Sequence, residues 1–377
     1  MPKVLLHIRS LDIGGSERQV ISIAKAVADI CGEVHIAMTV AGGQLELEVE
    51  DIPNIYLHHI KAKGLSRKVK YLLQLRSLIK SNKFDAVYGF LPVPNLALLI
   101  ARTLRHRPFI AWGVRSSDLD LSQYSNRVKW AMRVEKWLSR FSDTVITNSQ
   151  AAFTEYRSAG YANSKVRHIP NAIDTERFKP DHQARVSIRN ELNISHKATV
   201  IGLFARIHPM KDHITFLRAA KILIGKKPDT RFICAGSVSD GYSTFETLVK
   251  TTANDLGLGN HIYWLGARKD PERLMAACDI TTLTSDSGEG FPNSVAESVS
   301  CGVPCIATDI GDSANIVSNF TSVVPPKNPQ ALATEWETAL NQSSIEQSQS
   351  AMKMRQSIID RFSCKTVANL VIETLNH

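Results

Sequence analysis

The chain has 377 residues, 44% of them apolar and 21% charged, which predicts a folded protein with more than one core, because single cores rarely grow beyond about 250–300 residues. No apolar run approaches the roughly 20 residues of a membrane-spanning helix, and the start lacks the features of a secretory signal. The net charge of +9 lies in the first half: residues 1–172 carry 24 Lys and Arg against 14 Asp and Glu, and residues 173–377 carry 21 against 22. The first half is therefore expected to face an anionic partner.

Short apolar runs alternate with helical patterns along the first half. A helix is expected over Glu17–Asp29, because Val20, Ala24 and Val27 fall on one stripe. This alternation predicts a parallel sheet that is covered on both faces. The candidate strands are Val4–Ile8, Val34–Met38, Ala86–Gly89, Phe109–Trp112, Thr144–Asn148 and Val166–Ile169.

The segment Ile169–Asp174 is predicted to be a connector, after which the pattern restarts. Cys364–Leu375 has a helical pattern, and because no strand follows it, it can pack on either domain. We predict two α/β domains, residues 1–172 and 173–359, with a final helix over about residues 360–377. The second half offers strands Val200–Phe204, Arg231–Ala235, Ile262–Leu265, Ile280–Leu283 and Cys305–Thr308, and helices Asp212–Ile224, Thr244–Leu256, Pro271–Ala277 and Asn293–Cys301.

Gly14 and Gly15 follow the first strand and precede a helix. Adjacent glycines let the backbone approach a phosphate, and a helix start offers unpaired N–H groups. An ordinary strand-to-helix turn explains the pair equally well. The Gly-x-Gly-x-x-Gly fingerprint of dinucleotide-binding folds is absent from the sequence.

Arg206 and Lys211 follow the strand Val200–Phe204. In open α/β sheets, ligands bind beyond the carboxyl ends of the strands. There Arg206 can bind two oxygens of a diphosphate, and Lys211 adds a point charge. The alternative is a solvated loop that carries two cations.

The segment Glu289–Glu297 follows the strand Ile280–Leu283. Pro292 is expected at the first helical position, so that Asn293 and Ser294 present free N–H groups to a diphosphate. Glu297, one turn further, could accept hydrogen bonds from ribose hydroxyls, and Glu289 should stay in the loop, free to bind a sugar hydroxyl. The alternative is a first-turn carboxylate that only complements the helix dipole.

A basic segment without any acid runs from Lys61 to Lys83. Its apolar residues Val69, Leu72, Leu73 and Ile79 are expected to pack inward. The segment predicts attachment to anionic lipid, with a solvated helix face as the alternative. A nucleic acid is not expected, because Tyr71 is its single aromatic residue. The eight cations are Lys61, Lys63, Arg67, Lys68, Lys70, Arg76, Lys80 and Lys83.

Glu289 and Glu297 form the Glu-x7-Glu arrangement of the retaining family 4 glycosyltransferases, and the text from Glu289 to Thr308 resembles that family throughout. Three other segments resemble it too: Gly14-Gly15-Ser-Glu17, the connector Ile169–Asp174 with Phe178 and Pro180, and the Arg206/Lys211 pair. Glu-x7-Glu alone is a weak pattern, but these four segments in this order are specific. The resemblance covers almost the whole chain.

This resemblance implies the GT-B fold, in which two Rossmann-like domains face each other across a cleft and the final helix crosses back to the first domain. The first domain would take the acceptor and the second the nucleotide-sugar. The implied roles are as follows: Gly14 and Gly15 lie near the donor diphosphate; Arg206 and Lys211 neutralise that leaving group; Glu289 binds the donor sugar, assisted by the backbone of Gly290, Phe291, Pro292, Asn293 and Ser294; Glu297 holds the ribose; and Arg268 lies near the base.

Two positions depart from the family pattern. Many members carry a His after the fourth strand of the first domain, where this chain offers Arg115, whose role would be electrostatic because Arg is not a base at neutral pH. Ala172 stands where the connector often has Gly. Since no carboxylate nucleophile is evident, we expect a front-face retaining mechanism without a metal. The pair Asp118 and Asp120 matches a metal-binding pattern of another glycosyltransferase fold, and is interpreted as chance.

The expected partners are a nucleotide-sugar, most commonly a UDP-sugar in this family, and a glycan or polyprenyl-diphosphate acceptor of surface-polysaccharide or lipopolysaccharide assembly. Six scattered cysteines without a zinc-site pattern favour the cytoplasm. The basic segment and the lipid-linked acceptor that the resemblance implies add the expectation of a place at the inner face of the membrane. No cofactor is expected. The alternatives are a nucleotide-sugar epimerase or a phosphorylase of the same fold, an NAD-linked oxidoreductase and a non-catalytic sugar-binding protein.

Overall fold

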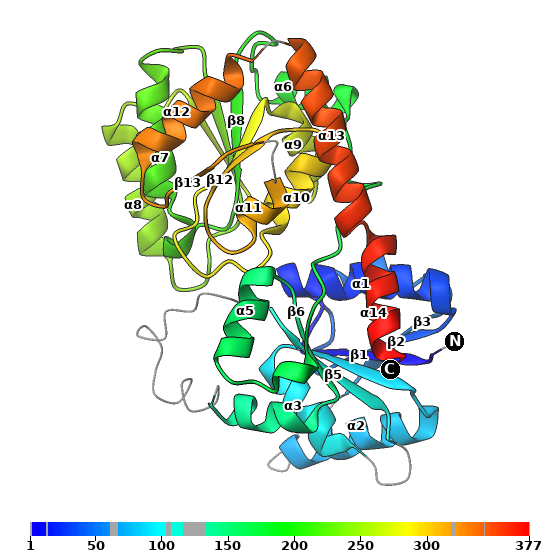
Figure 1. The fold of residues 1–377 in the computed structure, drawn as a ribbon. Coiled ribbons are helices and arrows are strands. Elements are labelled where there is room, and N and C mark those ends of the chain that lie inside the picture. The colour runs from blue at the N-terminus through cyan, green and yellow to red at the C-terminus, as the bar shows by residue number, and fades with distance from the viewer. Residues whose placement is uncertain are drawn as a thin grey trace. The chain divides into compact units, whose positions relative to one another are not determined.

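The structure is a computed structural model that describes residues 2–12, 14–60, 67–102, 107–115, 133–317, 321–342 and 344–376. The chain divides into two compact units (Figure 1). The first comprises Met1–Ala172 with Phe362–His377, and the second comprises Ile173–Arg361. The division falls inside the connector segment.

The described part of the first unit contains a parallel sheet of seven strands in the order β3-β2-β1-β4-β5-β6-β7. Its core lies on both faces. On one face α1 and α14 cover Leu6 and Ile8, and on the other α2, α3 and α5 cover Leu5 and Val87. The strands are β1 (Val4–Ile8), β2 (Val34–Met38), β3 (Ile55–His59), β4 (Ala86–Phe90), β5 (Phe109–Val114), β6 (Thr144–Thr147) and β7 (Val166–His168). The helices are α1 (Gly15–Cys31), α2 (Arg67–Asn82), α3 (Pro92–Ala101), α5 (Gln150–Ser158) and α14 (Cys364–Leu375).

The expected strands of this unit are present: β1 and β2 have the predicted bounds, and the others end one or two residues from the predicted position. Elements that the sequence reasoning did not name include β3 and α3. β3 is an edge strand in which only Ile55 is buried, so it lacks a clear apolar pattern. α3 begins Pro92-Val-Pro94, which suggests a turn, although proline is well accepted in the first turn of a helix.

The prediction for the basic helix α2 was wrong in part. Leu75 and Ile79 are buried, but Val69 is 58% exposed and Leu73 is 61% exposed. The inward face is completed by Tyr71, whose hydroxyl lies 2.6 Å from Nε2 of the buried His7. The apolar stripe therefore divides between two faces of the helix. Lys61 and Lys63 lie outside the described residues.

The second unit has a six-stranded parallel sheet in its described residues, with the order β10-β9-β8-β11-β12-β13. One face is filled by Phe216, Phe232 and Trp336, and the Trp336 indole N–H donates to Thr282 Oγ1 at 2.9 Å. The strands are β8 (Val200–Phe204), β9 (Arg231–Ala235), β10 (Ile262–Gly266), β11 (Ile280–Leu283), β12 (Cys305–Thr308) and β13 (Val323–Val324). The helices are α6 (His182–Glu191), α7 (His213–Ile224), α8 (Ser243–Asp255), α9 (Pro271–Ala277), α10 (Asn293–Ser300), α11 (Ser313–Val317), α12 (Pro329–Leu340) and α13 (Ser344–Phe362).

The final helix α14 belongs to the first unit, as the predicted return of the chain requires. It begins after Ser363, whose hydroxyl caps it, and it packs Val367 and Val371 against α1. No helix in the described part of the chain has both the length and the apolar character needed to cross a membrane.

Candidate functional site

Two loops far apart in sequence meet at the carboxyl ends of β8 and β11. The first carries Arg206 and Lys211, and the second runs from Thr284 to Phe291. Thr284 Oγ1 donates to the backbone oxygen of Lys211 at 2.8 Å, and the Asp286 amide donates to that of Met210 at 2.9 Å. Tertiary hydrogen bonds thus bring the predicted diphosphate-binding loop and the predicted sugar-binding loop together.

Lys211 and Glu289 form an ion pair inside this junction. The lysine Nζ donates to Glu289 Oε1, and Ser285 Oγ donates to the same oxygen at 2.6 Å. The Glu289 carboxylate is buried, so it needs a compensating charge. Glu289 lies in the loop, as expected, and its carboxylate is already held there by Lys211 and Ser285, while its contact with a sugar stays a prediction. Arg206 is exposed and forms no ion pair within the described residues.

A third loop supports the backbone of this site. Gly311, after β12, has a φ of +59°, and a Cβ there would lie 2.5 Å from the carbonyl oxygens of Glu289 and Gly290. The amide of the buried Asp312 donates to the Gly290 oxygen at 2.9 Å. Gly311 is thus required by conformation and by close approach. The sequence reasoning missed it, although a glycine just beyond a predicted strand is a usable signal.

The predicted position of Pro292 was wrong by one residue. Pro292 has a φ of −74° and a ψ of 97°, which is extended, so it is the N-cap and α10 begins at Asn293. Its carbonyl accepts from the Val295 amide at 3.1 Å. Asn293 and Ser294 are half-buried at the helix start, and Phe291 is buried beside them. Glu297 is half-buried one turn further along the same helix.

Arg268 is bound by carboxylates of its own unit. Its guanidinium donates to both oxygens of Asp270 at 2.8 and 2.9 Å and to Glu191 at 2.7 Å. These bonds raise the pKa of Arg268, and the arginine in turn lowers the pKa of Asp270. The side chain therefore has few N–H donors left for the base of a nucleotide. A contact with that base at this position would have to come from the backbone.

A cavity of about 470 Å³ lies at the carboxyl ends of β8, β9 and β10. His213 lines it, is 1% exposed, and its Nδ1 has no hydrogen-bond partner in the described chain. Burial lowers the pKa of His213 to about 4, so the ring is neutral at pH 7. Sequence reasoning missed His213, although it lies two residues after Lys211. The lining also includes Ala205, Ala235, Gly236, Ser237, Gly266 and Ala267.

The first unit holds Arg115 in place at the end of β5. One guanidinium nitrogen donates to Asn171 Oδ1 at 2.6 Å and another to the Tyr88 hydroxyl at 3.1 Å. The guanidinium also lies 4.7 Å from the centre of the Phe90 ring. Sequence reasoning named Arg115 but missed Tyr88 and Asn171, which are adjacent to it only in the folded sheet.

The predicted glycine pair lies at the start of α1. Gly14 is the N-cap and Gly15 begins the helix. One turn further, the Gln19 amide both donates to the Ala172 oxygen at 2.9 Å and accepts from its N–H at 2.7 Å. Gly14, Gly15, Arg115 and the connector up to Ala172 thus belong to the first unit, whereas the other predicted site residues belong to the second.

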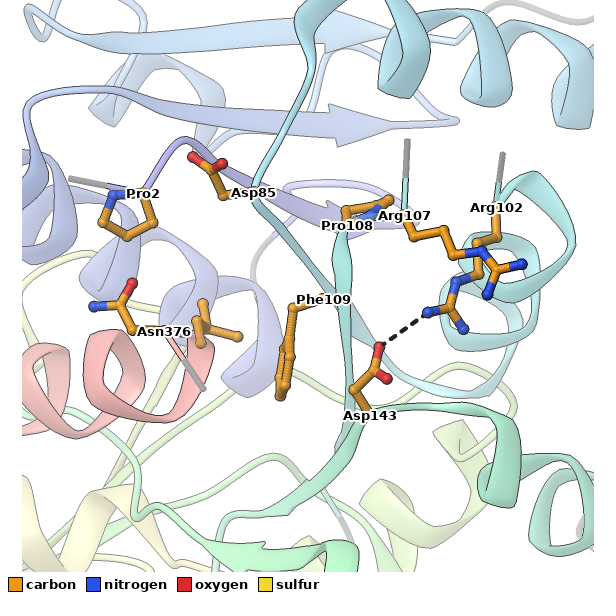
Figure 2. A pocket seen from close by; sticks show the side chains of 9 residues that line it. Pro2, Asp85, Arg102, Arg107, Pro108, Phe109, Asp143 and Asn376 are labelled. Atoms are coloured by element: carbon orange, nitrogen blue, oxygen red, sulfur yellow. Dashed lines mark ion pairs between the residues drawn. The ribbon is translucent and has the colours of Figure 1, made fainter. Parts of the chain in front are cut away.

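A larger cavity, of about 650 Å³, lies in the first unit at the end of the sheet opposite to Arg115 (Figure 2). Arg102 and Arg107 line it together with Asp85 and Asp143, and Arg102 pairs with Asp143 at 3.6 Å. It opens beside Phe109, where β5 begins, so it lies at the amino ends of the strands. None of the predicted site residues lines it.

Two family models match the chain. "Glycosyltransferase Family 4" matches residues 13–177, and "Glycosyl transferases group 1" matches residues 185–359. The chain belongs to the family 4 glycosyltransferases of the GT-B fold. The fold is also that of HepE from Anabaena, solved with UDP-glucose, which is 24% identical with a TM-score of 0.86 over 100% of both chains.

Curated relatives match over shorter segments. A UDP-Gal:α-D-GlcNAc-diphosphoundecaprenol α-1,3-galactosyltransferase of Escherichia coli is 27% identical over 68% of this chain and 66% of the relative. The lipopolysaccharide core mannosyltransferase LpsB of Rhizobium meliloti is 27% identical over 48% of this chain and 50% of the relative. The chain thus spans between half and two thirds of the length of these two relatives.

The described residues contain no cluster of three or more His, Cys, Asp or Glu side chains that could hold a metal. Asp118 and Asp120 lie outside the described residues, so the structure does not test the interpretation of that pair.

Proposed function

We propose that this protein is a retaining glycosyltransferase that moves a sugar from a UDP-sugar to a glycan or polyprenyl-diphosphate-linked acceptor in bacterial surface-polysaccharide assembly. The observation that carries this proposal is the junction of the Arg206–Lys211 loop with the Glu289 loop, beside the start of α10. Cations, backbone amides and the Glu289 carboxylate meet there at the carboxyl ends of parallel strands, where open α/β sheets bind ligands.

The proposed chemistry is a front-face transfer. The bond between the sugar C1 and the diphosphate oxygen breaks, the acceptor oxygen bonds to C1 on the same face, and the acceptor proton passes to the departing phosphate oxygen. Arg206 and Lys211 stabilise the negative charge that develops on this leaving group. Lys211 is already held by Glu289, so its charge is oriented before the donor binds.

The Lys211–Glu289 pair gives Glu289 two tasks. Its Oε1 accepts from Lys211 and Ser285, and we propose that the carboxylate also receives a hydroxyl of the donor sugar. An ionised carboxylate has about four lone-pair sites, enough for all three donors. A bound donor sugar would therefore hydrogen-bond to the same carboxylate that orients Lys211 toward the diphosphate.

Arg115 is proposed to stabilise charge from the first unit. Tyr88 and Asn171 hold its guanidinium, and the Nε–H is buried without a partner in the described chain. Arginine is not a base at neutral pH, so the contribution of Arg115 would be electrostatic rather than general base catalysis.

Support for the donor and acceptor comes from the relatives. The Escherichia coli relative is named for a UDP-sugar and a diphosphoundecaprenol acceptor, and HepE was solved with UDP-glucose. The acceptor would be lipid-borne, so we propose that the protein works at the inner face of the cell membrane. The transfer is proposed to need no metal, because the protein's own cations offset the leaving charge.

The test is to incubate the purified protein with a panel of UDP- and GDP-sugars and to measure nucleoside diphosphate release, with and without a membrane-lipid extract. Release from one donor that rises with the extract supports the proposal and names the donor. Conversion of the donor without diphosphate release would indicate an epimerase. Loss of release with a chelator and its recovery with Mn²⁺ would refute metal independence.

A further inference from the structure

The helices α2 and α3 pack against each other on one face of the first unit's sheet (Figure 1). Both helices expose aliphatic side chains. On α2, Val69 is 58% exposed and Leu73 is 61% exposed; on α3, Val93 is 70% exposed and Ile100 is 61% exposed. A single exposed aliphatic residue is ordinary, but four on two adjacent helices need an explanation.

The charges on α2 surround its exposed aliphatic pair. Lys68, Lys70, Arg76 and Lys80 are exposed, and none of them pairs with a carboxylate in the part of the chain that the structure describes. At 3.6 residues per turn, Val69, Leu73, Arg76 and Lys80 fall within about 60° of one another around the helix. One exposed stripe therefore begins with two aliphatic side chains and ends with two cations. α3 carries no charged residue between Pro92 and Ala101.

We propose that this α2–α3 face inserts into the interfacial region of an anionic bilayer. Val69, Leu73, Val93 and Ile100 would enter the boundary between headgroups and acyl chains, while the cations of α2 would lie against lipid phosphates. This is the arrangement of an interfacial amphipathic helix, here formed by two packed helices. The inference rests on the proposed lipid-borne acceptor, and it adds that apolar insertion, not charge alone, holds the protein there.

The observations favour a bilayer over other occupants. A single-stranded nucleic acid needs exposed aromatic side chains for stacking. Tyr71, the aromatic residue of α2, instead turns inward and bonds to His7. A second copy of the chain would bring the unpaired cations of two α2 helices together, which costs free energy. An anionic bilayer complements both the aliphatic side chains and the cations.

The face is connected to the predicted acceptor side of the first unit. α3 begins where β4 ends, and its buried Asn95 donates to the Gly113 backbone oxygen at 3.1 Å. Gly113 lies on β5, and Arg115 follows it two residues later, just beyond the end of that strand. The helix α3 would therefore contact both the bilayer and the carboxyl end of the sheet. A lipid-linked acceptor has to arrive at that end.

The test is co-sedimentation with phosphatidylcholine vesicles, with and without phosphatidylglycerol. The variant Leu73→Ser/Ile100→Ser should reduce binding to the anionic vesicles by about tenfold or more for each side chain removed from lipid. Lys70→Gln/Arg76→Gln should reduce it by roughly fivefold per cation and only at low salt. The matched control is Leu47→Ser, which removes a 77% exposed leucine of the same unit outside these two helices.

A second measurement reports insertion directly. Tryptophan fluorescence of Leu73→Trp should be quenched by brominated lipid, and that of Leu47→Trp should not. Unchanged vesicle binding in Leu73→Ser/Ile100→Ser, equal binding to neutral vesicles, or no quenching in Leu73→Trp would each overturn the inference. None of these measurements uses donor turnover, so a failure here leaves diphosphate release, and with it the proposed function, separately testable.

Discussion

Several cations of the second unit and the cations of α2 in the first unit differ in their ion pairing. In the second unit, Lys211 is held by Glu289, and Arg268 is held by Asp270 and Glu191. Arg189 is only 1% exposed and pairs with Asp279. In the first unit, the exposed cations of α2 have no carboxylate partner within the described residues.

This difference indicates what each charge can act on. A paired and half-buried cation has a fixed position, so it can stabilise charge on one atom of a bound substrate. An unpaired cation on a long, solvated side chain has no fixed position, and suits a surface whose phosphates are not fixed either. We therefore expect mutations in the second unit to affect turnover, and mutations of α2 to affect where the protein resides.

The largest effect is expected from Arg206→Ala and Lys211→Ala. Each removes a cation from the leaving group, and losses of this kind reduce turnover by about 10²–10³-fold. The measurement is kcat at saturating donor, with Lys353→Ala at an exposed position of α13 as the control. Near-normal kcat in both variants would refute the proposed charge stabilisation.

Glu289→Gln should separate the two tasks proposed for this carboxylate. The amide keeps the shape but removes the charge that holds Lys211, so we expect turnover to fall by about 10²-fold, as for the loss of a charge-assisted contact made in the transition state. Donor KM and kcat are measured together. If both match the wild type, the assigned contact is wrong.

Acid should destabilise the second unit through His213. Its folded pKa is about 4, below the ordinary value of about 6.5, so at intermediate pH the unfolded chain binds the proton first. The stability due to the neutral ring is complete above about pH 6.5 and is lost as the pH falls toward about 4, by at most about 3 kcal/mol. In urea unfolding, the free energy of unfolding of His213→Gln should therefore fall less between about pH 7 and pH 5 than that of the wild type. The exposed His196→Gln variant is the control, and an equal loss in all three proteins would contradict the prediction.

Gly311→Ala should damage the second unit's site through the backbone. The new methyl group would collide with the Glu289 and Gly290 carbonyl oxygens, at a cost of about 1–3 kcal/mol for the strained conformation alone. Gly241→Ala is a matched control, because it has a φ of +81° but no atom within 4 Å of the added carbon. The thermal unfolding midpoint Tm and kcat should both fall in Gly311→Ala. An effect no larger than that of Gly241→Ala would contradict the supporting role of Gly311.

The smallest effect is expected from Asn171→Ala in the first unit. Arg115 would lose one of its two hydrogen-bonding partners, which should lower kcat by about tenfold, the value of one such bond to a charged group. Donor KM should not change, and Asn171→Asp, which keeps an acceptor oxygen, should restore kcat. A raised KM or a failure of that rescue would indicate a merely structural role.

Most of the fold was open to sequence reasoning, because strands in a parallel sheet are buried on both faces and appear as short apolar runs. Thus β1, β2, β8, β9, β11 and β12 have the predicted bounds. β3 was missed because an edge strand need not be apolar, and α3 because its prolines resemble a turn. Arg206, Lys211, Glu289 and Glu297 were predicted as site residues from their positions near strand ends and from the family resemblance of their segments, and their roles stay predictions.

The sequence alone determined the two α/β domains and the residue types of the candidate site, whereas the return of the final helix to the first unit was implied by the family resemblance and is seen in the tertiary structure. Only the tertiary structure decided which of these side chains are paired. The Glu289–Lys211 contact joins residues from two separate strand ends, and the exposure of Val69 and Leu73 depends on which side of α2 meets the sheet. Neither follows from local spacing, because charge pairing and burial depend on what the rest of the chain places alongside each residue.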